Sequence, residues 1–168
     1  PIHGAQDVTW IGVSLQDLEH WRWTLSPINA GLYDGVGGLA LFFGYLSAVT
    51  GRGDFAALAR KAAETVRAQW RTPDPMDYPS VGALAGRASH VYVLSHLAAV
   101  LGEPGLLDEV HAELGALEAK IDADKALDLC SGVAGCALVL LRLHQQTGSA
   151  EALRLARRCG ERMLQTAS

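Results

Sequence analysis

The stretch LYDGVGGLALFFGYLSAVTG, residues 32–51, sets out the unit from which the chain is built. It places two glycines three residues apart, continues with an apolar run, and ends on a third glycine. DLCSGVAGCALVLLRLHQQTG, residues 128–148, repeats this order, and GRASHVYVLSHLAAVLG, residues 86–102, repeats it with a serine as the second small residue. The small residues are spaced by 3 and then 13 positions in each copy. Internal repeats of this length are a strong signal of fold.

Each copy predicts a buried helix that ends on a glycine. The small residues at its start allow backbone to approach backbone, because no large side chain stands between them. The apolar run has no polar face, so we expect the helix to be buried on all sides. Gly51, Gly102 and Gly148 stand where a left-handed C-cap belongs.

An amphipathic helix is predicted after each of these glycines. In the second copy its apolar residues recur at helical spacing, as in Val110, Leu114, Leu117 and Ile121. Each repeat is therefore a helical hairpin with an apolar inner helix and a half-exposed outer helix. Such hairpins must stack inner beside inner, either as an open superhelix or as a closed ring. The apolar character of the inner helices favours the ring, so we predict an all-α fold of about three hairpins.

Residues 1–30 form a different, tryptophan-rich lead-in to the hairpins of residues 31–168. Trp10, Trp21 and Trp23 lie in it, and WRWTL alternates like a short extended segment that ends at Pro27. We expect a strap that covers one side of the first hairpin, and a ligand-stacking aromatic site is the alternative. The link over residues 71–81 holds three prolines and is predicted to be a loop.

Composition narrows the possible functions. The 168 residues include 14 basic and 18 acidic ones without a Lys/Arg cluster, which argues against nucleic-acid binding. The longest apolar stretch, residues 35–49, is shorter than the roughly 20 residues of a membrane span. The start at Pro1 without a signal peptide suggests a segment of a longer cytoplasmic protein. Cys130, Cys136 and Cys159 form no CxxC pair, so reduced thiols are expected.

Two aspartates precede glycine-started helices. Asp128 lies shortly before Ser131 and Asp34 directly before Gly35, where a carboxylate can accept hydrogen bonds from free helical N–H groups. From the residues alone, capping is the expected role of both. We leave open whether Arg87 faces the centre of the fold or its surface.

The histidines and cysteines do not suggest a metal site. His90 and His96 are six residues apart, which places them on opposed faces of a helix, so structural roles are expected. Cys136 and His144 are eight residues apart and out of line, and no carboxylate completes a set.

The two glycine phrases at 32–51 and 128–148, with the lead-in TWIGVSLQ…WRWTLSPINAGLYDG, resemble the lanthionine synthetase C-like family. The lead-in is most similar to the cyclase half of the class II LanM enzymes. The resemblance implies an α/α toroid in which about seven hairpins stack around a zinc site, residues 31–168 supplying the first three. The implied reaction is lanthionine or methyllanthionine formation, the addition of a cysteine thiol of a precursor peptide to dehydroalanine or dehydrobutyrine.

The resemblance also implies a site residue and a cofactor. Asp128 matches the aspartate of the family's Asp-x-x-x-Gly-x-x-Gly phrase, so a catalytic role in proton transfer is expected, with its direction open. The family binds zinc through a cysteine and a later Cys-His pair, and zinc removes the proton of a bound thiol. Neither motif occurs here, so the zinc ligands of the full-length parent are expected outside this chain, as is the family's catalytic histidine.

These implications lead to further expectations. The segment alone is expected neither to bind zinc nor to catalyse, and to self-associate through the exposed flank of an incomplete toroid. Two rival functions remain. One is a non-catalytic helical-repeat scaffold that binds a partner protein. The other is a different α/α-toroid enzyme such as a glycoside hydrolase, for which Asp34 and Asp128 are the only carboxylates we can pair.

Overall fold

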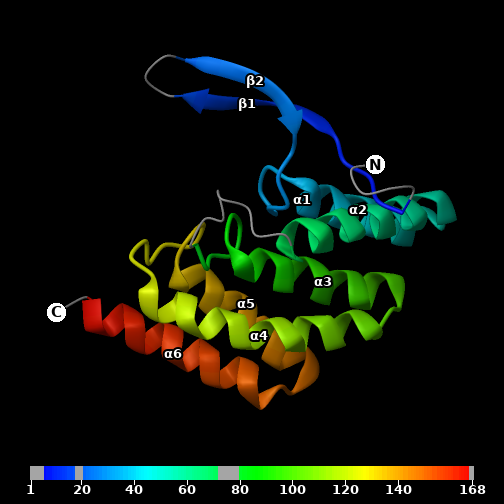
Figure 1. The fold of residues 1–168 in the computed structure, drawn as a ribbon. Coiled ribbons are helices and arrows are strands. Elements are labelled where there is room, and N and C mark those ends of the chain that lie inside the picture. The colour runs from blue at the N-terminus through cyan, green and yellow to red at the C-terminus, as the bar shows by residue number, and fades with distance from the viewer. Residues whose placement is uncertain (1–5, 18–20, 72–79, 167–168) are drawn as a thin grey trace.

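Three helical hairpins follow a two-stranded sheet in the computed structural model, which describes residues 6–17, 21–71 and 80–166 (Figure 1). The elements in these ranges are β1 (Ile11–Asp17), β2 (Arg22–Pro27), α1 (Val36–Thr50), α2 (Gly53–Arg71), α3 (Arg87–Leu101), α4 (Gly105–Ala123), α5 (Val133–Thr147) and α6 (Ala150–Thr166). The all-α fold of helical hairpins is thus confirmed. The proline-rich link falls mainly on residues 72–79, outside the described residues.

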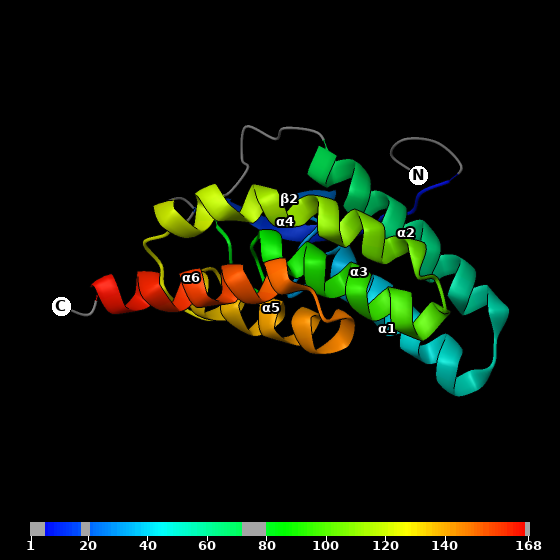
Figure 2. The same cartoon turned by 90° about the horizontal axis from the view of Figure 1, so that it is seen from below.

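The helices form two layers. The inner helices contact one another in the order α1, α3, α5, and each packs against its own outer partner, α2, α4 or α6 (Figures 1 and 2). The core lies between the layers, and its largest fully buried side chains include Leu94, Leu97, Leu114, Leu117, Ile121, Leu140, Leu143 and Leu155. Burial of these side chains supplies most of the driving force for folding.

The inner helices begin and end at the predicted glycines. Gly35, Gly86 and Gly132 are extended N-cap residues without a side-chain cap. Gly51, Gly102 and Gly148 are left-handed C-caps with φ of 70°, 69° and 72°. A side chain in this conformation would be strained, so glycine ends each helix cleanly.

The expectation that the inner helices are buried on every side is wrong: α3 comes nearest to it, but His96 is only partly buried and Ala99 is exposed. Phe42 of α1 is 56% exposed, and Leu138 and Leu141 of α5 are 58% and 41% exposed. The reason is position in the layer. Helix α3 has an inner neighbour on both sides, whereas α1 and α5 each have one inner neighbour in the described structure.

Equivalent repeat positions show which side of an inner helix faces which neighbour. Seven residues after the N-cap glycine, Val93 is buried where α1 approaches, whereas its counterpart Phe42 is exposed. Nine residues after it, Gly44 and Ser95 are buried by the following inner helix, whereas Leu141 is exposed. Phe42 and Leu141 therefore mark the two open flanks of the inner layer.

A short part of the lead-in covers the first hairpin as predicted. The Trp10 ring stacks on the Phe43 ring of α1 with centroids 5.9 Å apart. The backbone N–H of Val8 donates to the Thr65 hydroxyl of α2 at 3.1 Å. This segment is the strap.

The prediction is wrong for Trp21 and Trp23, which are 67% and 61% exposed. They belong to an antiparallel hairpin of β1 and β2 that projects from the helices (Figure 1). Its register gathers apolar residues on one face, in the cross-strand pairs Ile11–Pro27, Val13–Leu25 and Leu15–Trp23. The chain leaves the bundle after the strap and returns at Ile28, whose N–H donates to the Trp10 carbonyl at 3.0 Å. Trp21 and Trp23 therefore do not cover the first helical hairpin (Figure 1).

Candidate functional site

The loops that lead into the three inner helices lie edge to edge at one end of the molecule (Figure 1). The Leu84 carbonyl of the second loop accepts hydrogen bonds from Leu32 N at 2.9 Å and Tyr33 N at 3.3 Å in the first loop. The Ser131 carbonyl of the third loop accepts from Gly82 N of the second loop at 2.8 Å, and the Cys130 carbonyl accepts from Leu84 N at 3.1 Å. We call this set, residues 29–35, 80–86 and 127–132, the loop layer.

Glycine makes the close approach in the loop layer possible. A Cβ added at Gly135 would overlap the Leu129 carbonyl oxygen and come within 2.7 Å of Ala83 N. A Cβ at Gly82 would overlap the backbone of Cys130 and Ser131. The repeated small residues predicted close backbone contacts within each repeat. The structure shows that such contacts also join the second repeat to the third.

Asp128 lies in the third loop, at the start of α5. Its Oδ1 accepts a hydrogen bond from Ser131 N at 2.7 Å, and its carbonyl accepts from Gly132 N at 3.1 Å and Gly135 N at 3.3 Å. The side chain is exposed. Its backbone is thus held rigidly, while no hydrogen bond to Oδ2 is found among the described residues. Asp128 can therefore present one carboxylate oxygen to a ligand.

Asp124 makes the contact that was expected of Asp128. Its buried Oδ2 accepts from Val133 N, the first N–H of α5, at 3.1 Å and from Leu127 N at 2.9 Å. Leu127 has a φ of 58°, a conformation that favours glycine, and the second hydrogen bond helps to hold it there. Sequence reasoning missed Asp124 because it lies nine residues before Val133, outside any local capping pattern.

The prediction that Asp34 caps α1 is wrong. The first N–H of α1, on Val36, donates to the Asn29 carbonyl at 2.8 Å, and the helix has no side-chain cap. Asp34 Oδ1 instead accepts from Asn29 Nδ2 at 3.0 Å. The loop turns back on itself, so a backbone carbonyl reaches the helix start before the carboxylate does.

A row of polar side chains crosses the inner layer on the side away from the outer helices. Tyr45, His96 and Arg142 each stand ten residues after their N-cap glycine. Tyr45 Oη and His96 Nδ1 share a hydrogen bond of 2.7 Å. The centroids of the Tyr92 and His96 rings are 4.2 Å apart. Burial, and then the positive charge of Arg142, lower the pKa of His96 below its usual range. We call this set the inner-face row.

His90 lies on a different face of α3 from His96, as predicted. It is buried beside a hollow of about 210 Å³ between α2, α3 and α4, lined by Arg67, Arg71, His90, Glu109, Ala112 and Glu113. Burial, followed by the charges of Arg87, Arg67 and Arg71, lowers the pKa of His90 to about 4. The imidazole is therefore neutral at pH 7, and its burial between the helices fits a structural role.

Arg87 faces neither the centre of the fold nor bulk solvent. Its Nη1 lies 3.4 Å from Glu113 Oε2 of α4, and its side chain is 16% exposed. It lies between the two layers.

The three cysteines are free thiols in two environments. Cys130 is exposed in the loop layer, whereas Cys136 and Cys159 are buried between α5 and α6. A hydrogen bond with Cys159, followed by burial, raises the pKa of Cys136 far above its ordinary value. His144 does not approach Cys136 for a joint role, because its Nδ1 contacts the Ser149 carbonyl at 2.9 Å. Cys136 is thus held as a neutral thiol.

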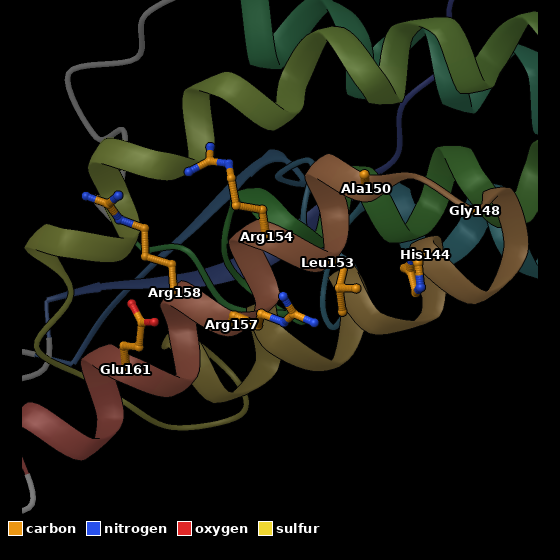
Figure 3. A pocket seen from close by; sticks show the side chains of 8 residues that line it. All are labelled: His144, Gly148, Ala150, Leu153, Arg154, Arg157, Arg158 and Glu161. Carbon is orange, nitrogen blue, oxygen red and sulfur yellow. The ribbon is translucent and has the colours of Figure 1, made fainter.

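The α5–α6 turn carries a second hollow, of about 380 Å³, with three arginines along its rim (Figure 3). Arg154 and Arg158 point toward α4, where they pair with Glu118 and Asp122, whereas Arg157 lies on the other side of α6 beside Leu153 (Figure 3). Arg154 and Arg158 are therefore already paired with carboxylates of α4. The residues that line the hollow do not form a catalytic arrangement.

Two classes of site can be tested directly. Within residues 6–17, 21–71 and 80–166, no three His, Cys, Asp or Glu side chains gather in a way that could hold a metal ion. The donors in these ranges therefore do not fit a zinc site. None of the helices in these ranges combines the length and apolar character needed to cross a membrane.

Comparison with known protein families finds one relation. The family model described as lanthionine synthetase C-like protein matches residues 26–168, which include all three hairpins and the whole loop layer. No curated protein matches the chain significantly.

Proposed function

The chain belongs to the lanthionine synthetase C-like family, and on that premise we propose that it is part of a cyclase that forms thioether rings in a precursor peptide. The match over residues 26–168 is the observation that carries this proposal. The position of Asp128 supports it, because the family's motif aspartate stands in a rigid loop with one carboxylate oxygen open. The tryptophan-rich lead-in further supports a class II, LanM-like enzyme of the cytoplasm.

The proposed chemistry forms one carbon–sulfur bond, and in net terms the proton that the thiol loses is replaced by one at the α-carbon. The sulfur of a peptide cysteine bonds to the β-carbon of dehydroalanine or dehydrobutyrine, and the electron pair of the double bond moves to form an enolate. The α-carbon then takes up a proton, so the ring product has the mass of the open peptide. Asp128 would take a proton from the thiol or pass one to the α-carbon, and we leave the direction open.

Zinc is part of the family's chemistry, where it makes a bound thiol a thiolate at neutral pH. The described residues supply no ligand set for it. We propose that the ligands belong to a longer parent protein, and that residues 1–168 alone form no rings.

The test is Asp128→Asn in the complete protein, with Asp34→Asn as the matched control. Each variant is incubated with a dehydrated precursor peptide, and unreacted cysteine is counted by alkylation and mass spectrometry. We expect Asp128→Asn to slow ring formation by about 100-fold or more, and Asp34→Asn to leave it nearly unchanged. Equal rates for the two variants would remove Asp128 from the mechanism.

The rival functions predict other results. A glycoside hydrolase needs two carboxylates on one cleft, whereas the Asp34 carboxylate is hydrogen-bonded to Asn29 within the first loop. A binding scaffold would leave thiols of the dehydrated peptide unreacted in the wild-type protein. Family membership favours the cyclase over both.

We further propose that the isolated segment self-associates. The open flank at Leu141 is the surface where a following inner helix would pack, and Phe42 marks the opposite flank. Contact of one flank with the other in a second copy would be head to tail. We expect dimers or larger assemblies in light scattering, reduced by Leu141→Lys. A wild-type monomer at millimolar concentration would contradict this.

A further inference from the structure

The inner layer has an unusual charge distribution. None of the 18 acidic residues of the chain lies in α1, α3 or α5. These three helices contain only two arginines, Arg87 and Arg142, although the chain as a whole has a net charge of −4. The inner layer therefore carries positive charge without any acid, whereas every outer helix contains both acids and bases.

The two arginines are not equivalent. Arg87 is directed to the outer layer, where it pairs with Glu113. Arg142 is exposed, and no ion pair or hydrogen bond of its side chain is found among the residues that the structure describes. The positive charge of Arg142 on the inner face is thus available to a ligand.

The neighbours of Arg142 suit a carboxylate ligand. It belongs to the inner-face row, in which Tyr45 and His96 already share a hydrogen bond of 2.7 Å. Arg142 is near enough to His96 to lower the pKa of that imidazole. A guanidinium can hold a carboxylate through two parallel hydrogen bonds, and uncharged polar groups beside it add donors without a competing charge.

We propose that the inner-face row binds the side-chain carboxylate of an aspartate or glutamate in the precursor peptide. This inference rests on the proposed function, since it places the peptide on the inner face. The charge distribution carries it, because a carboxylate is the group that complements an unpaired arginine in a layer without acids.

The geometry also sets a spacing. Asp128 lies at the N-terminal end of α5, and Arg142 is the tenth residue of that helix. At 1.5 Å per residue the two are about 15 Å apart along the helix. An extended peptide covers this distance in about four or five residues. The preferred acidic residue therefore lies four or five positions from the reacting cysteine.

Binding of synthetic peptides tests the inference without any ring formation. The probe is a fluorescein-labelled, C-terminally amidated peptide of Gly, Ser and Leu with one cysteine and one glutamate five positions away. Its partner peptide has glutamine in place of glutamate. Affinities are measured by fluorescence anisotropy in low salt with the complete protein.

We expect the wild type to prefer the glutamate peptide by about 5- to 10-fold. Arg142→Gln should abolish this preference, and Arg142→Glu should instead prefer a lysine peptide. Arg157→Gln, which removes an exposed arginine from the outer helix α6, is the matched control and should keep the wild-type preference. Equal binding of the two peptides by the wild type, or an unchanged preference in Arg142→Gln, would overturn the inference.

Moving the glutamate to one or nine positions from the cysteine should remove most of the preference, and a preference independent of position would overturn the spacing. The proposed function fails separately, if the complete protein forms no rings while the glutamate preference persists. Conversely, ring formation with no glutamate preference would leave the cyclase and remove the carboxylate site.

Discussion

The inner and outer layers are built from helices of similar length, yet different interactions hold them in place. The inner helices contain no acid, begin at glycines, and are joined by backbone hydrogen bonds of the loop layer. The outer helices are joined by ion pairs, such as Arg67–Glu109 between α2 and α4 and Arg154–Glu118 between α4 and α6. Close backbone packing therefore positions the inner helices, whereas ion pairs contribute to positioning the outer helices. Similar substitutions should have different consequences in the two layers.

The largest contrast is expected at glycines. Gly135→Ala places a methyl group against the Leu129 carbonyl and Ala83 N in the inner layer, so we expect a loss of at least about 3 kcal/mol in unfolding free energy. Gly115→Ala in the outer helix α4 meets nothing within 4 Å and should gain about 0.5–1 kcal/mol from helix propensity. Urea denaturation of both variants measures the difference. A tolerated Gly135→Ala would show that the loop layer is not tightly packed.

The second contrast is between His90, buried between the layers, and solvent-exposed histidine in the unfolded chain. The folded-state pKa of His90 is about 4, against 6.5 for the ordinary side chain, so between these pH values the unfolded state binds more protons. Stability contributed by neutral His90 is thus complete above pH 6.5 and lost as pH falls toward 4, by about 3 kcal/mol.

His90→Gln removes this titration and should flatten that part of the curve in pH-dependent urea denaturation. Five charged groups of α2, α3 and α4 face or act on His90: Arg67, Arg71, Arg87, Glu109 and Glu113. Subtracting the variant curve from the wild-type curve separates His90 from these groups. Parallel curves between pH 4 and 6.5 would show that His90 is not desolvated.

A third contrast compares aspartates of the third and first repeats. Asp124→Ala leaves the Val133 and Leu127 N–H groups without their carboxylate acceptor, and we expect a loss of about 2 kcal/mol. Asp34→Ala removes an exposed hydrogen bond to Asn29 and should have a much smaller effect. Thermal unfolding of both variants at pH 7 checks this. A larger effect at Asp34 would reverse our assignment of the helix-start acceptor.

The smallest effect is expected in the outer layer. Arg158→Gln removes exposed ion pairs to Glu118 and Asp122. Exposed pairs are screened by salt, so the small loss of stability at low salt should vanish in 1 M NaCl. The urea midpoints of wild type and variant at both salt concentrations decide this. A loss that persists in 1 M salt would mean that packing of the Arg158 stem matters more than its charge.

Much of the fold could be predicted because its signals are local. The glycine spacing located the start and end of each inner helix, and the apolar stripes located the outer helices. The β-hairpin was predicted only as an extended segment at WRWTL, although Ile11, Val13 and Leu15 of the other strand alternate with small or polar residues in the same way. Asp128 was singled out by a motif, whereas Asp124 and the Tyr45–His96 contact could not be found, since their partners lie in another element or far along the chain.

The sequence alone determined that this protein consists of repeated helical hairpins, because helix capping and apolar periodicity act over a few neighbouring residues. Only the tertiary structure decided which of those helices remain open on one flank and which polar groups meet. Phe42 and Val93 occupy the same position in their repeats, yet one is 56% exposed and the other fully buried. The difference depends on whether another helix packs there, which no local pattern in the sequence encodes.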